Sequence, residues 1–245
     1  MFARSQQLYD AIYTWKDYQK EAARLAEIVA AHKTAPGNDL LDVACGTGGH
    51  FPHLRETFRV EGVDLDAGML AVARAKHPGV PLHQGDMMAF DLGRQFDVVV
   101  SLFSSIGYAR TPERMAAAVR SMARHVRPGG VLLIEPYFSP QAWKPREKAP
   151  GANVVDRPDI TVVRMVDWVR NGNAVDALFH YLVGTPSGVE HFTEVHEMGL
   201  FSHEEHCAAF TSAGMAVTFD EAGLMGRGLY VGTWAQPAAQ ERADG

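Results

Sequence analysis

Two hydrophobic patterns alternate along the first 135 residues of the chain. In one, apolar residues lie three or four positions apart with charged residues between them, which predicts amphipathic helices; the other is a short continuous apolar run, which predicts buried strands. The predicted helices are 5–33, 49–57, 66–76 and 112–125, and the predicted strands are 40–44, 59–64, 80–83, 96–103 and 130–135. Alternating units of this length favour parallel strands with right-handed crossovers, so we expect a doubly wound α/β domain.

The pattern changes after Glu135. Residues 137–159 are rich in proline and charge, which predicts a long loop. From 160 to 201 apolar and polar residues alternate, which predicts three antiparallel strands joined by the turns Asn171-Gly172-Asn173 and Pro186-Ser187-Gly188. We interpret this segment as an insertion that covers one end of the parallel sheet.

The chain then returns to the first pattern. Ser202-His203-Glu204-Glu205 is a capping box that opens a helix to about residue 213, and two strands follow near 215–221 and 228–234. The expected organisation is N-terminal helices (1–37), a sheet domain (38–136 and 202–235), a loop with an antiparallel insertion (137–201) and a disordered tail (236–245).

Composition narrows the class of protein. The chain has 245 residues, of which 47% are hydrophobic and 21% charged, so we expect a sizeable core and no wholesale disorder. A net charge of −6 argues against nucleic acid or an anionic membrane as partner. The two cysteines, Cys45 and Cys207, form no disulfide framework, and no apolar run approaches the ~20 residues of a membrane span. We therefore expect a cytoplasmic monomer or homodimer.

The first candidate site is the glycine-rich turn Ala44-Cys45-Gly46-Thr47-Gly48-Gly49, directly after the first predicted strand. Open parallel sheets bind ligands at this end of their strands, and glycine lets the backbone approach a ligand closely. A nicotinamide-dependent dehydrogenase would need a small residue three positions after Gly48, where this chain has Phe51. A tight turn without a ligand remains an alternative.

Carboxylates follow the next two predicted strands. Asp64 ends the second strand, 18 residues after Gly46, where a carboxylate can accept both ribose hydroxyls of an adenosine. Gly85-Asp86-Met87 follows the third strand, where Asp86 can take the adenine amino group and Met87 can pack on the ring. A single acidic residue at a strand end is usually a cap, but acidic residues at successive strand ends favour an adenosine site.

With these motifs the chain resembles the class I S-adenosylmethionine-dependent methyltransferases. The matching motifs, in family order, are Asp42-Val43-Ala44-Cys45-Gly46-Thr47-Gly48, Asp64, Gly85-Asp86-Met87, Phe96-Asp97-Val98-Val99 and Arg127-Pro128-Gly129-Gly130. The resemblance implies a mostly parallel, seven-stranded Rossmann-like sheet and S-adenosyl-L-methionine as cofactor. It further implies that Ala44 and Gly46 border the methionine part, Asp64 the ribose, Asp86 and Met87 the adenine, and Leu102 and Phe103 the sulfonium.

A narrower resemblance covers nearly the whole chain. Its motifs are Leu8-Tyr9-Asp10, Lys16-Asp17-Tyr18, His83-Gln84-Gly85-Asp86-Met87, Phe103-Ser104-Ser105-Ile106-Gly107, Glu135-Pro136, Leu200-Phe201 and Gly226-Arg227-Gly228-Leu229. They look like the N,N-dimethyltransferases of nucleotide-linked amino sugars in antibiotic biosynthesis. This resemblance implies an acceptor site under the insertion, with Tyr9 and Tyr18 near the cofactor carboxylate, Arg227 facing the acceptor's phosphates and Tyr108 where the acceptor meets the methyl group.

The acceptor side departs from that family. Tyr137-Phe138 stand where the family tends to have tryptophans, and His196-Glu197-Met198-Gly199 is a more acidic segment than the family's. Tyr137 remains a candidate for stacking on the acceptor, and His180 and His191 on the insertion are candidates for contact with it. An alternative is therefore a C- or O-methyltransferase of another natural product, such as an indole-type alkaloid.

Methyl transfer needs alignment more than it needs a strong catalyst, because the sulfonium carries a good leaving group. An ammonium acceptor must also lose a proton, so we expect Tyr108 to bind the acceptor nitrogen or relay its proton; a structural tyrosine under the insertion is the alternative. The eleven histidines form no familiar ligand pattern, so no metal site is predicted. A cofactor-binding protein without catalysis is a further alternative.

Overall fold

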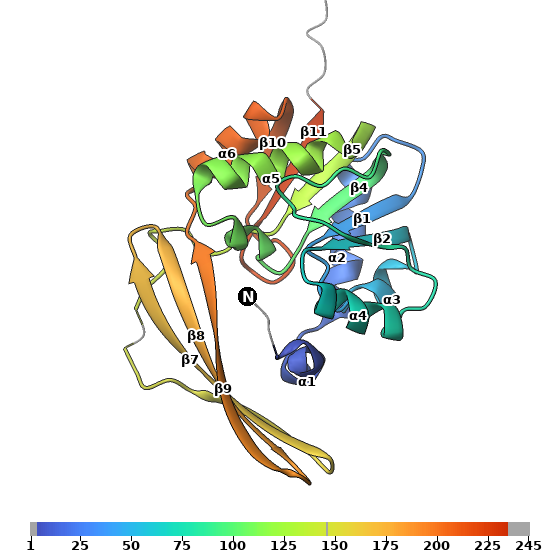
Figure 1. Cartoon of the computed structure of the whole chain (residues 1–245). Coiled ribbons are helices and arrows are strands. Elements are labelled where there is room, and N and C mark those ends of the chain that lie inside the picture. The colour runs from blue at the N-terminus through green and yellow to red at the C-terminus, as the bar shows by residue number, and fades with distance from the viewer. Residues whose placement is uncertain (1–3, 146, 235–245) are drawn as a thin grey trace, which may run out of the picture.

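The computed structural model describes residues 4–145 and 147–234, which form two β-sheets (Figure 1). Sheet A has seven strands in the order β10-β11-β5-β4-β1-β2-β3, and sheet B has four in the order β6-β7-β8-β9. The predicted disordered tail, 236–245, lies outside the described residues. Among the residues described, no helix combines the length and apolar character needed to cross a membrane.

Sheet A has the predicted doubly wound, mostly parallel architecture. Its parallel strands are β1 (Asp39–Val43), β2 (Arg59–Asp64), β3 (Leu82–Gln84), β4 (Phe96–Ser101) and β5 (Val126–Ile134). The last two strands, β10 (Met215–Asp220) and β11 (Leu229–Trp234), complete the sheet, and β11 is antiparallel to β5. The chain leaves β1 to one side for β2 and returns on its other side for β4. Ligands bind at such a switch point, outside the carboxyl ends of the strands.

Helices cover both faces of sheet A (Figure 1). They are α2 (Tyr18–His32), α3 (Phe51–Leu54), α4 (Ala67–Lys76), α5 (Pro112–Arg124) and α6 (His203–Ser212), with the 3-10 turn η2 (Ser105–Ala109) before α5. One core cluster joins α2 and α3 to the sheet through residues such as Leu25 and Phe51. The other joins α5 and α6 through residues such as Met115 and Phe210. The predicted capping box is formed, because Ser202 and Glu205 bond reciprocally at the start of α6.

The N-terminal segment is broken where one long helix was predicted. In place of a helix over 5–33, the chain forms the 3-10 turn η1 (Gln6–Leu8), α1 (Tyr9–Ile12) and then α2. The Asp17 side chain accepts a hydrogen bond from the Lys20 backbone N–H at 2.9 Å, so Asp17 starts a new helix rather than continuing the old one. The break lets α1 lie beside sheet B (Figure 1), where Ile12 packs against Val162 and Tyr181.

Sheet B is an antiparallel sheet with one more strand than predicted. Its strands are β6 (Ala152–Arg157), β7 (Ile160–Asn171), β8 (Ala174–Thr185) and β9 (Gly188–Gly199). The prediction of a loop over 137–159 is therefore wrong for β6. This strand is only six residues long, so its alternating pattern is short. Pro150 and Pro158 flank it, and prolines at both ends favour the prediction of a loop. It pairs only with the first half of β7, as an edge strand.

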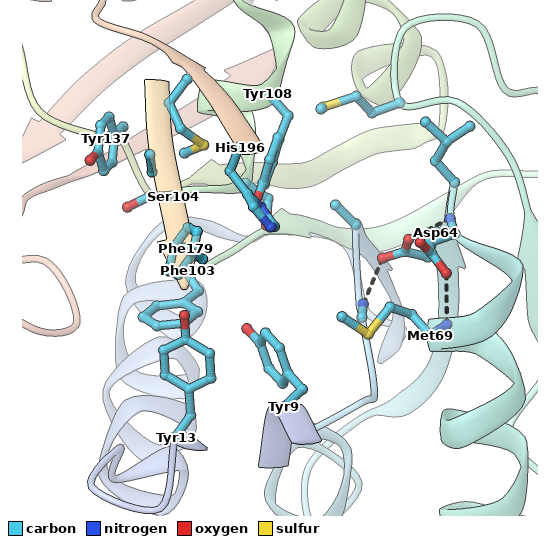
Figure 2. Close-up of a pocket in the computed structure, with 18 of the residues that line it drawn as sticks. Tyr9, Tyr13, Asp64, Met69, Phe103, Ser104, Tyr108, Tyr137, Phe179 and His196 are labelled. Atoms are coloured by element: carbon cyan, nitrogen blue, oxygen red, sulfur yellow. Dashed lines mark hydrogen bonds between the residues drawn. The ribbon is translucent and has the colours of Figure 1, made fainter. Parts of the chain in front are cut away.

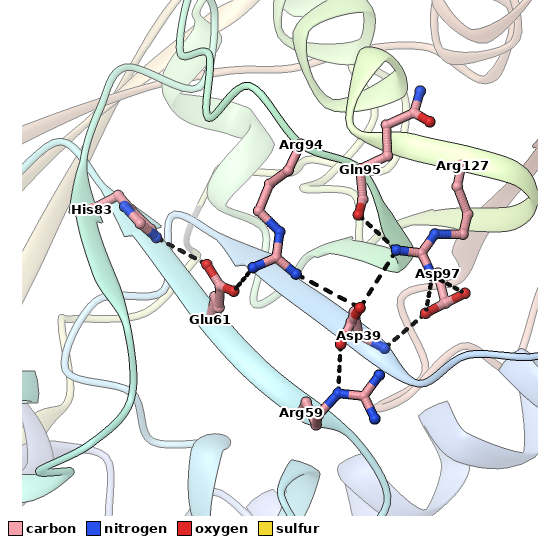
Figure 3. A network of polar contacts seen from close by, with 8 residues as sticks. All are labelled: Asp39, Arg59, Glu61, His83, Arg94, Gln95, Asp97 and Arg127. Atoms are coloured by element: carbon pink, nitrogen blue, oxygen red, sulfur yellow. Dashed lines mark hydrogen bonds and ion pairs between the residues drawn. The ribbon is translucent and has the colours of Figure 1, made fainter.

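Charged residues join the strands at the amino edge of sheet A (Figure 3). Arg127 Nη1 donates to both carboxylate oxygens of the buried Asp97 at 3.0 Å, and Arg127 Nη2 reaches Asp39 at 3.4 Å. Asp39 also pairs with Arg59, and Arg94 with Glu61, each at 2.6 Å. The motif residues Asp97 and Arg127 thus tie β4 to β5 at this edge.

Candidate active site

A cavity of about 330 Å³ lies between the carboxyl edge of sheet A and one face of sheet B (Figure 2). This is the size range of small-molecule sites. Of the predicted site residues, those that line it are Tyr9, Ala44, Gly46, Asp64, Asp86, Met87, Phe103, Tyr108, Tyr137 and Arg227. A smaller adjoining cavity of about 40 Å³ is lined by Tyr18 and Leu102, and shares Tyr9, Ala44, Gly46 and Phe103 with the first.

Asp64 is held firmly at the end of β2. Its Oδ2 accepts a hydrogen bond from the Gly46 backbone N–H at 2.7 Å, and its Oδ1 accepts one from the Asp66 N–H at 2.8 Å. Both bonds are visible in Figure 2. Each carboxylate oxygen retains a further lone pair for a ligand. Burial raises the pKa of Asp64 despite these bonds, because a charge in this position loses hydration.

The glycine turn leaves room beside Asp64. Gly46 has φ +57°, and a Cβ there would point into space that no atom occupies within 4 Å. Gly49 has no such freedom, because a Cβ would come within 2.7 Å of the Tyr18 ring. The turn therefore approaches Tyr18 closely on one side and leaves open space at Gly46 on the other.

Asp42 lies at the smaller cavity. Burial, and then the neighbouring charge of Asp64, raises the pKa of Asp42 to about 8. An ammonium group in this cavity would stabilise the ionised form of Asp42. The smaller cavity thus suits the amino end of a ligand.

The wall beyond Asp64 is largely apolar. Leu65, Met69, Met87 and Met88 line it, and the Asp86 carboxylate accepts the Met88 N–H at 2.9 Å. Methionine side chains adapt well to a flat ring. Thioether side chains suit a flat ring, and the carboxylates of Asp64 and Asp42 suit ribose hydroxyls and an ammonium, so the residues present fit S-adenosylmethionine.

Phe103 forms the wall where the two cavities meet. Phe103 and Ser104 have φ of 53° and 63°, the left-handed region that is rare for such residues. The buried Glu135 accepts the Phe103 N–H at 2.6 Å, and the Lys16 ammonium lies 4.1 Å from the centre of the Phe103 ring. Both contacts support a strained turn, which is typical of a ligand site.

Tyr108 and His196 meet inside the main cavity (Figure 2). The Tyr108 hydroxyl lies 2.6 Å from Nδ1 of His196. Burial raises the pKa of Tyr108 well above its ordinary value and lowers the pKa of His196 to about 4, so both side chains are neutral near pH 7.

Of the three arginines that line this cavity, Arg164 and Arg227 make polar contacts at its walls. Arg227 Nη1 donates to Ser104 Oγ at 3.0 Å, and its guanidinium lies 5.6 Å from the centre of the Phe138 ring. Arg164 on β7 donates to the Tyr13 hydroxyl at 3.0 Å. Within 4–145 and 147–234, neither arginine forms an ion pair with a carboxylate. Their charge is therefore available to an anionic ligand.

His180 and His191 are not brought to either cavity. Their rings stack on each other, 5.9 Å apart between centroids, on β8 and β9. On β8 the cavity residues Ala177 and Phe179 occupy odd positions, so His180 points to the other face of the sheet. His191 lies opposite Leu182 and shares that face. The role predicted for the two histidines has no support from this geometry.

Several cavity residues of sheet B, and one at the end of α1, were not predicted from the sequence. They are Tyr13, Arg164, Val166, Trp168, Ala177, Phe179, His196 and Met198. The signal was present in part, because residues 162, 164, 166 and 168 share one face of a predicted strand, as do residues 177, 179, 181 and 183 of the next. Assigning β9 to the same face required its register, in which His196 lies opposite Ala177.

Known proteins resemble the chain over most of its length. A family model described as a methyltransferase domain matches residues 40–130. A dTDP-3-amino-3,4,6-trideoxy-alpha-D-glucopyranose N,N-dimethyltransferase of Streptomyces venezuelae is 46% identical over 229 residues, which are 92% of this chain and 95% of that protein.

Solved structures agree with these relatives. The crystal structure of Streptomyces venezuelae DesVI has a TM-score of 0.87 and 43% identity, covering 96% of this chain and 100% of its own. An amino pentose methyltransferase of Micromonospora echinaspora, involved in calicheamicin biosynthesis and solved with bound S-adenosylmethionine, has a TM-score of 0.81 and 37% identity. That match covers 96% of this chain and 98% of its own.

Proposed function

Because the chain belongs to the S-adenosylmethionine-dependent N,N-dimethyltransferases of nucleotide-linked amino sugars, we propose that its own acceptor is the amine of such a sugar nucleotide. The observation that carries the proposal is the composition of the main cavity. Its sheet A wall fits S-adenosylmethionine, and its other walls bring Tyr108, Arg164 and Arg227 to the same space. The acceptor is therefore expected to combine an amine with an anionic group.

Different residues of the cavity bind the cofactor and the acceptor. S-adenosylmethionine supplies an electrophilic methyl group on a sulfonium. Asp64 and Asp86 hold the adenosine end, and Phe103 closes the wall between the two cavities. Tyr108, on η2 and in contact with His196 of β9, binds the acceptor nitrogen. Holding two reactants in line supplies most of the catalysis that such a displacement needs.

Arg227 is the side chain that we assign to the acceptor's phosphates. Its planar guanidinium can bond two phosphate oxygens at once, as the point charge of a lysine cannot. The Ser104 hydroxyl, which accepts from Arg227 and donates to the Pro136 carbonyl at 2.8 Å, fixes one edge of the guanidinium. The aromatic Phe138 supports its face.

The test compares a nucleotide-linked amino sugar with the same amino sugar lacking the nucleotide. We expect the wild-type enzyme to prefer the nucleotide form, and Arg227→Lys to raise the acceptor KM about tenfold or more while leaving cofactor affinity unchanged. The matched control is Arg120→Lys, an exposed arginine on α5. Equal turnover of both acceptors would contradict the proposal and favour an acceptor without phosphates, such as an indole-type alkaloid.

The cellular location, partners and oligomeric state of the enzyme are also part of the proposal. We infer a cytoplasmic enzyme of secondary metabolism that takes a small-molecule acceptor and neither nucleic acid nor membrane, as a monomer or homodimer. The net charge of −6 supports this inference, because an acidic protein is repelled by nucleic acid and by anionic lipid.

A further inference from the structure

We propose that His196 makes the Tyr108 oxygen a pure hydrogen-bond acceptor in the cavity, and that this oxygen recognises the N–H of the acceptor amine and so limits transfer to two methyl groups. The inference rests on the proposed function, because it concerns how the same cavity binds its amine. His196 acts here as a positioning residue and Tyr108 as the group that touches the acceptor.

Glu194 determines which nitrogen of His196 carries the proton. His196 Nε2 lies 3.7 Å from Oε2 of Glu194, and its Nδ1 lies 2.6 Å from the Tyr108 hydroxyl. A proton on Nε2 faces the carboxylate favourably, whereas a lone pair there would be repelled by it. The hydrogen bond or charge at one ring nitrogen of a neutral imidazole fixes which nitrogen is protonated. Nδ1 is therefore unprotonated and accepts the hydrogen bond of Tyr108.

The Glu194 carboxylate is itself held in place. Its Oε1 accepts the backbone N–H groups of Arg4 and Ser5 at 2.7 and 3.1 Å, and its Oε2 accepts the Ser5 hydroxyl at 2.6 Å. These donors stabilise the charged form of the carboxylate and keep it beside His196. The segment before η1 therefore helps to orient a side chain in the cavity.

His196 also stays neutral. Burial is the main cause that lowers its pKa to about 4, and Glu194 opposes this shift without cancelling it. A protonated ring would carry a proton on Nδ1 and could not accept from Tyr108. Near pH 7 the Tyr108 hydroxyl must therefore donate to His196, and the remaining lone pair of its oxygen faces the cavity.

An oxygen that can only accept a hydrogen bond distinguishes amines by their number of N–H groups. A neutral primary amine can give one N–H to Tyr108 and still direct its lone pair at the methyl group. After the first transfer the nitrogen is an ammonium, which must release a proton to water before it can react again. The resulting secondary amine has a single N–H, which must serve this bond. A neutral tertiary amine has none, so it loses the contact after the second transfer. A hydroxyl acceptor also has one O–H, so the same rule would allow only one transfer to oxygen.

The experiment uses the full-length enzyme with a nucleotide-linked amino sugar and with its monomethylated form. In His196→Leu the Tyr108 hydroxyl can rotate, and we expect the KM for the monomethylated acceptor to rise about tenfold, with less effect on the primary amine. The monomethyl product should then accumulate. His196→Asn places an acceptor oxygen near the position of Nδ1 and should restore the wild-type product ratio.

A double-mutant cycle separates action through Tyr108 from direct contact. Tyr108→Phe should reproduce the effect of His196→Leu, and the double variant should lie within about twofold of Tyr108→Phe. His32→Leu, at an exposed position on α2, is the matched control. S-adenosylmethionine affinity and circular dichroism establish that each variant is folded.

Several outcomes would overturn the inference. They are equal effects of His196→Leu and His196→Asn, additive effects of the Tyr108 and His196 substitutions, and a trimethylated product from the wild type. If the wild type methylates no amine at all, the proposed function fails and this inference fails with it. If the wild type forms the dimethylamine but the His196 variants do the same with unchanged KM, only this inference fails.

Discussion

Asp64→Ala probes the contact on which the cofactor site depends. Asp64 accepts the N–H groups of Gly46 and Asp66, and its remaining lone pairs face the cavity. The substitution removes the acceptor for the two ribose hydroxyls and also releases the glycine turn from β2. We therefore expect weaker cofactor binding while the sheet, which has its own core, remains folded.

The magnitude follows from the two lost contacts. A hydrogen bond to a charged group contributes about 1.5–3 kcal/mol. Because the cavity is partly solvated, we take the lower value for each bond, so the two bonds contribute about 3 kcal/mol. This corresponds to a roughly 150-fold rise in Kd. Asp64→Asn should cost nearly as much, because its amide nitrogen would face the N–H of either Gly46 or Asp66.

The pH dependence has a definite sign. The charged form of Asp64 binds the ribose, and burial raises the pKa of this carboxyl above the ordinary aspartate value. Cofactor affinity should therefore be full above that raised pKa and should be lost as the pH falls through it. The decline should begin at a higher pH than an exposed aspartate would give.

Isothermal titration calorimetry with S-adenosylmethionine and with its homocysteine product measures these constants. Asp91→Ala, at an exposed aspartate that accepts only the Gly93 N–H at 2.8 Å among the hydrogen bonds described, is the control and should leave Kd unchanged. An Asp64→Ala variant that is folded and binds with wild-type Kd would refute the reasoning. Tighter binding of NADH than of S-adenosylmethionine would refute the assignment of the cavity.

Two further predictions concern stability. His206 is buried and stacks on Tyr230, and burial lowers its pKa to about 3, against about 6.5 in an unfolded chain. Between these values the unfolded chain binds the proton, so stability falls as the pH falls; His206→Phe should show a smaller loss of Tm between pH 7 and pH 4.5. Lys16→Met should lower the free energy of unfolding by about 3–5 kcal/mol in urea titrations, because it leaves the buried Glu21 without its ammonium partner. The exposed Lys20→Met should change it by less than about 0.5 kcal/mol, and equal effects would contradict this account.

The sheet domain was predictable because its signals are local. The strands β1, β4 and β5 carry short apolar runs, and the carboxylates at the strand ends are read from adjacent residues. The seven-stranded, mostly parallel architecture is accordingly confirmed. The N-terminal break was missed because Asp17 acts as a cap only through the position of its side chain, which hydrophobic spacing does not report.

The acceptor side was less predictable because its residues come together through pairing. His196 reaches Tyr108 only when β9 takes its register beside β8, and a shift of one residue would exchange the two faces. His180 and His191 were predicted to contact the acceptor because they are histidines of the insertion. The face of the sheet on which their side chains lie was not predicted. In the cavity Arg164 of β7 donates to Tyr13, the residue after α1, a contact across 151 residues of sequence.

Mass spectrometry of a single reaction tests the central claim most directly. The purified enzyme is incubated with S-adenosylmethionine and a dTDP-linked amino sugar, and the methyl groups on the sugar nitrogen are counted over time. We expect a monomethyl intermediate followed by a dimethylamine at which the reaction stops, with one homocysteine product formed for each methyl transferred. An unmodified amine, or a methyl group on oxygen or carbon, would contradict the account.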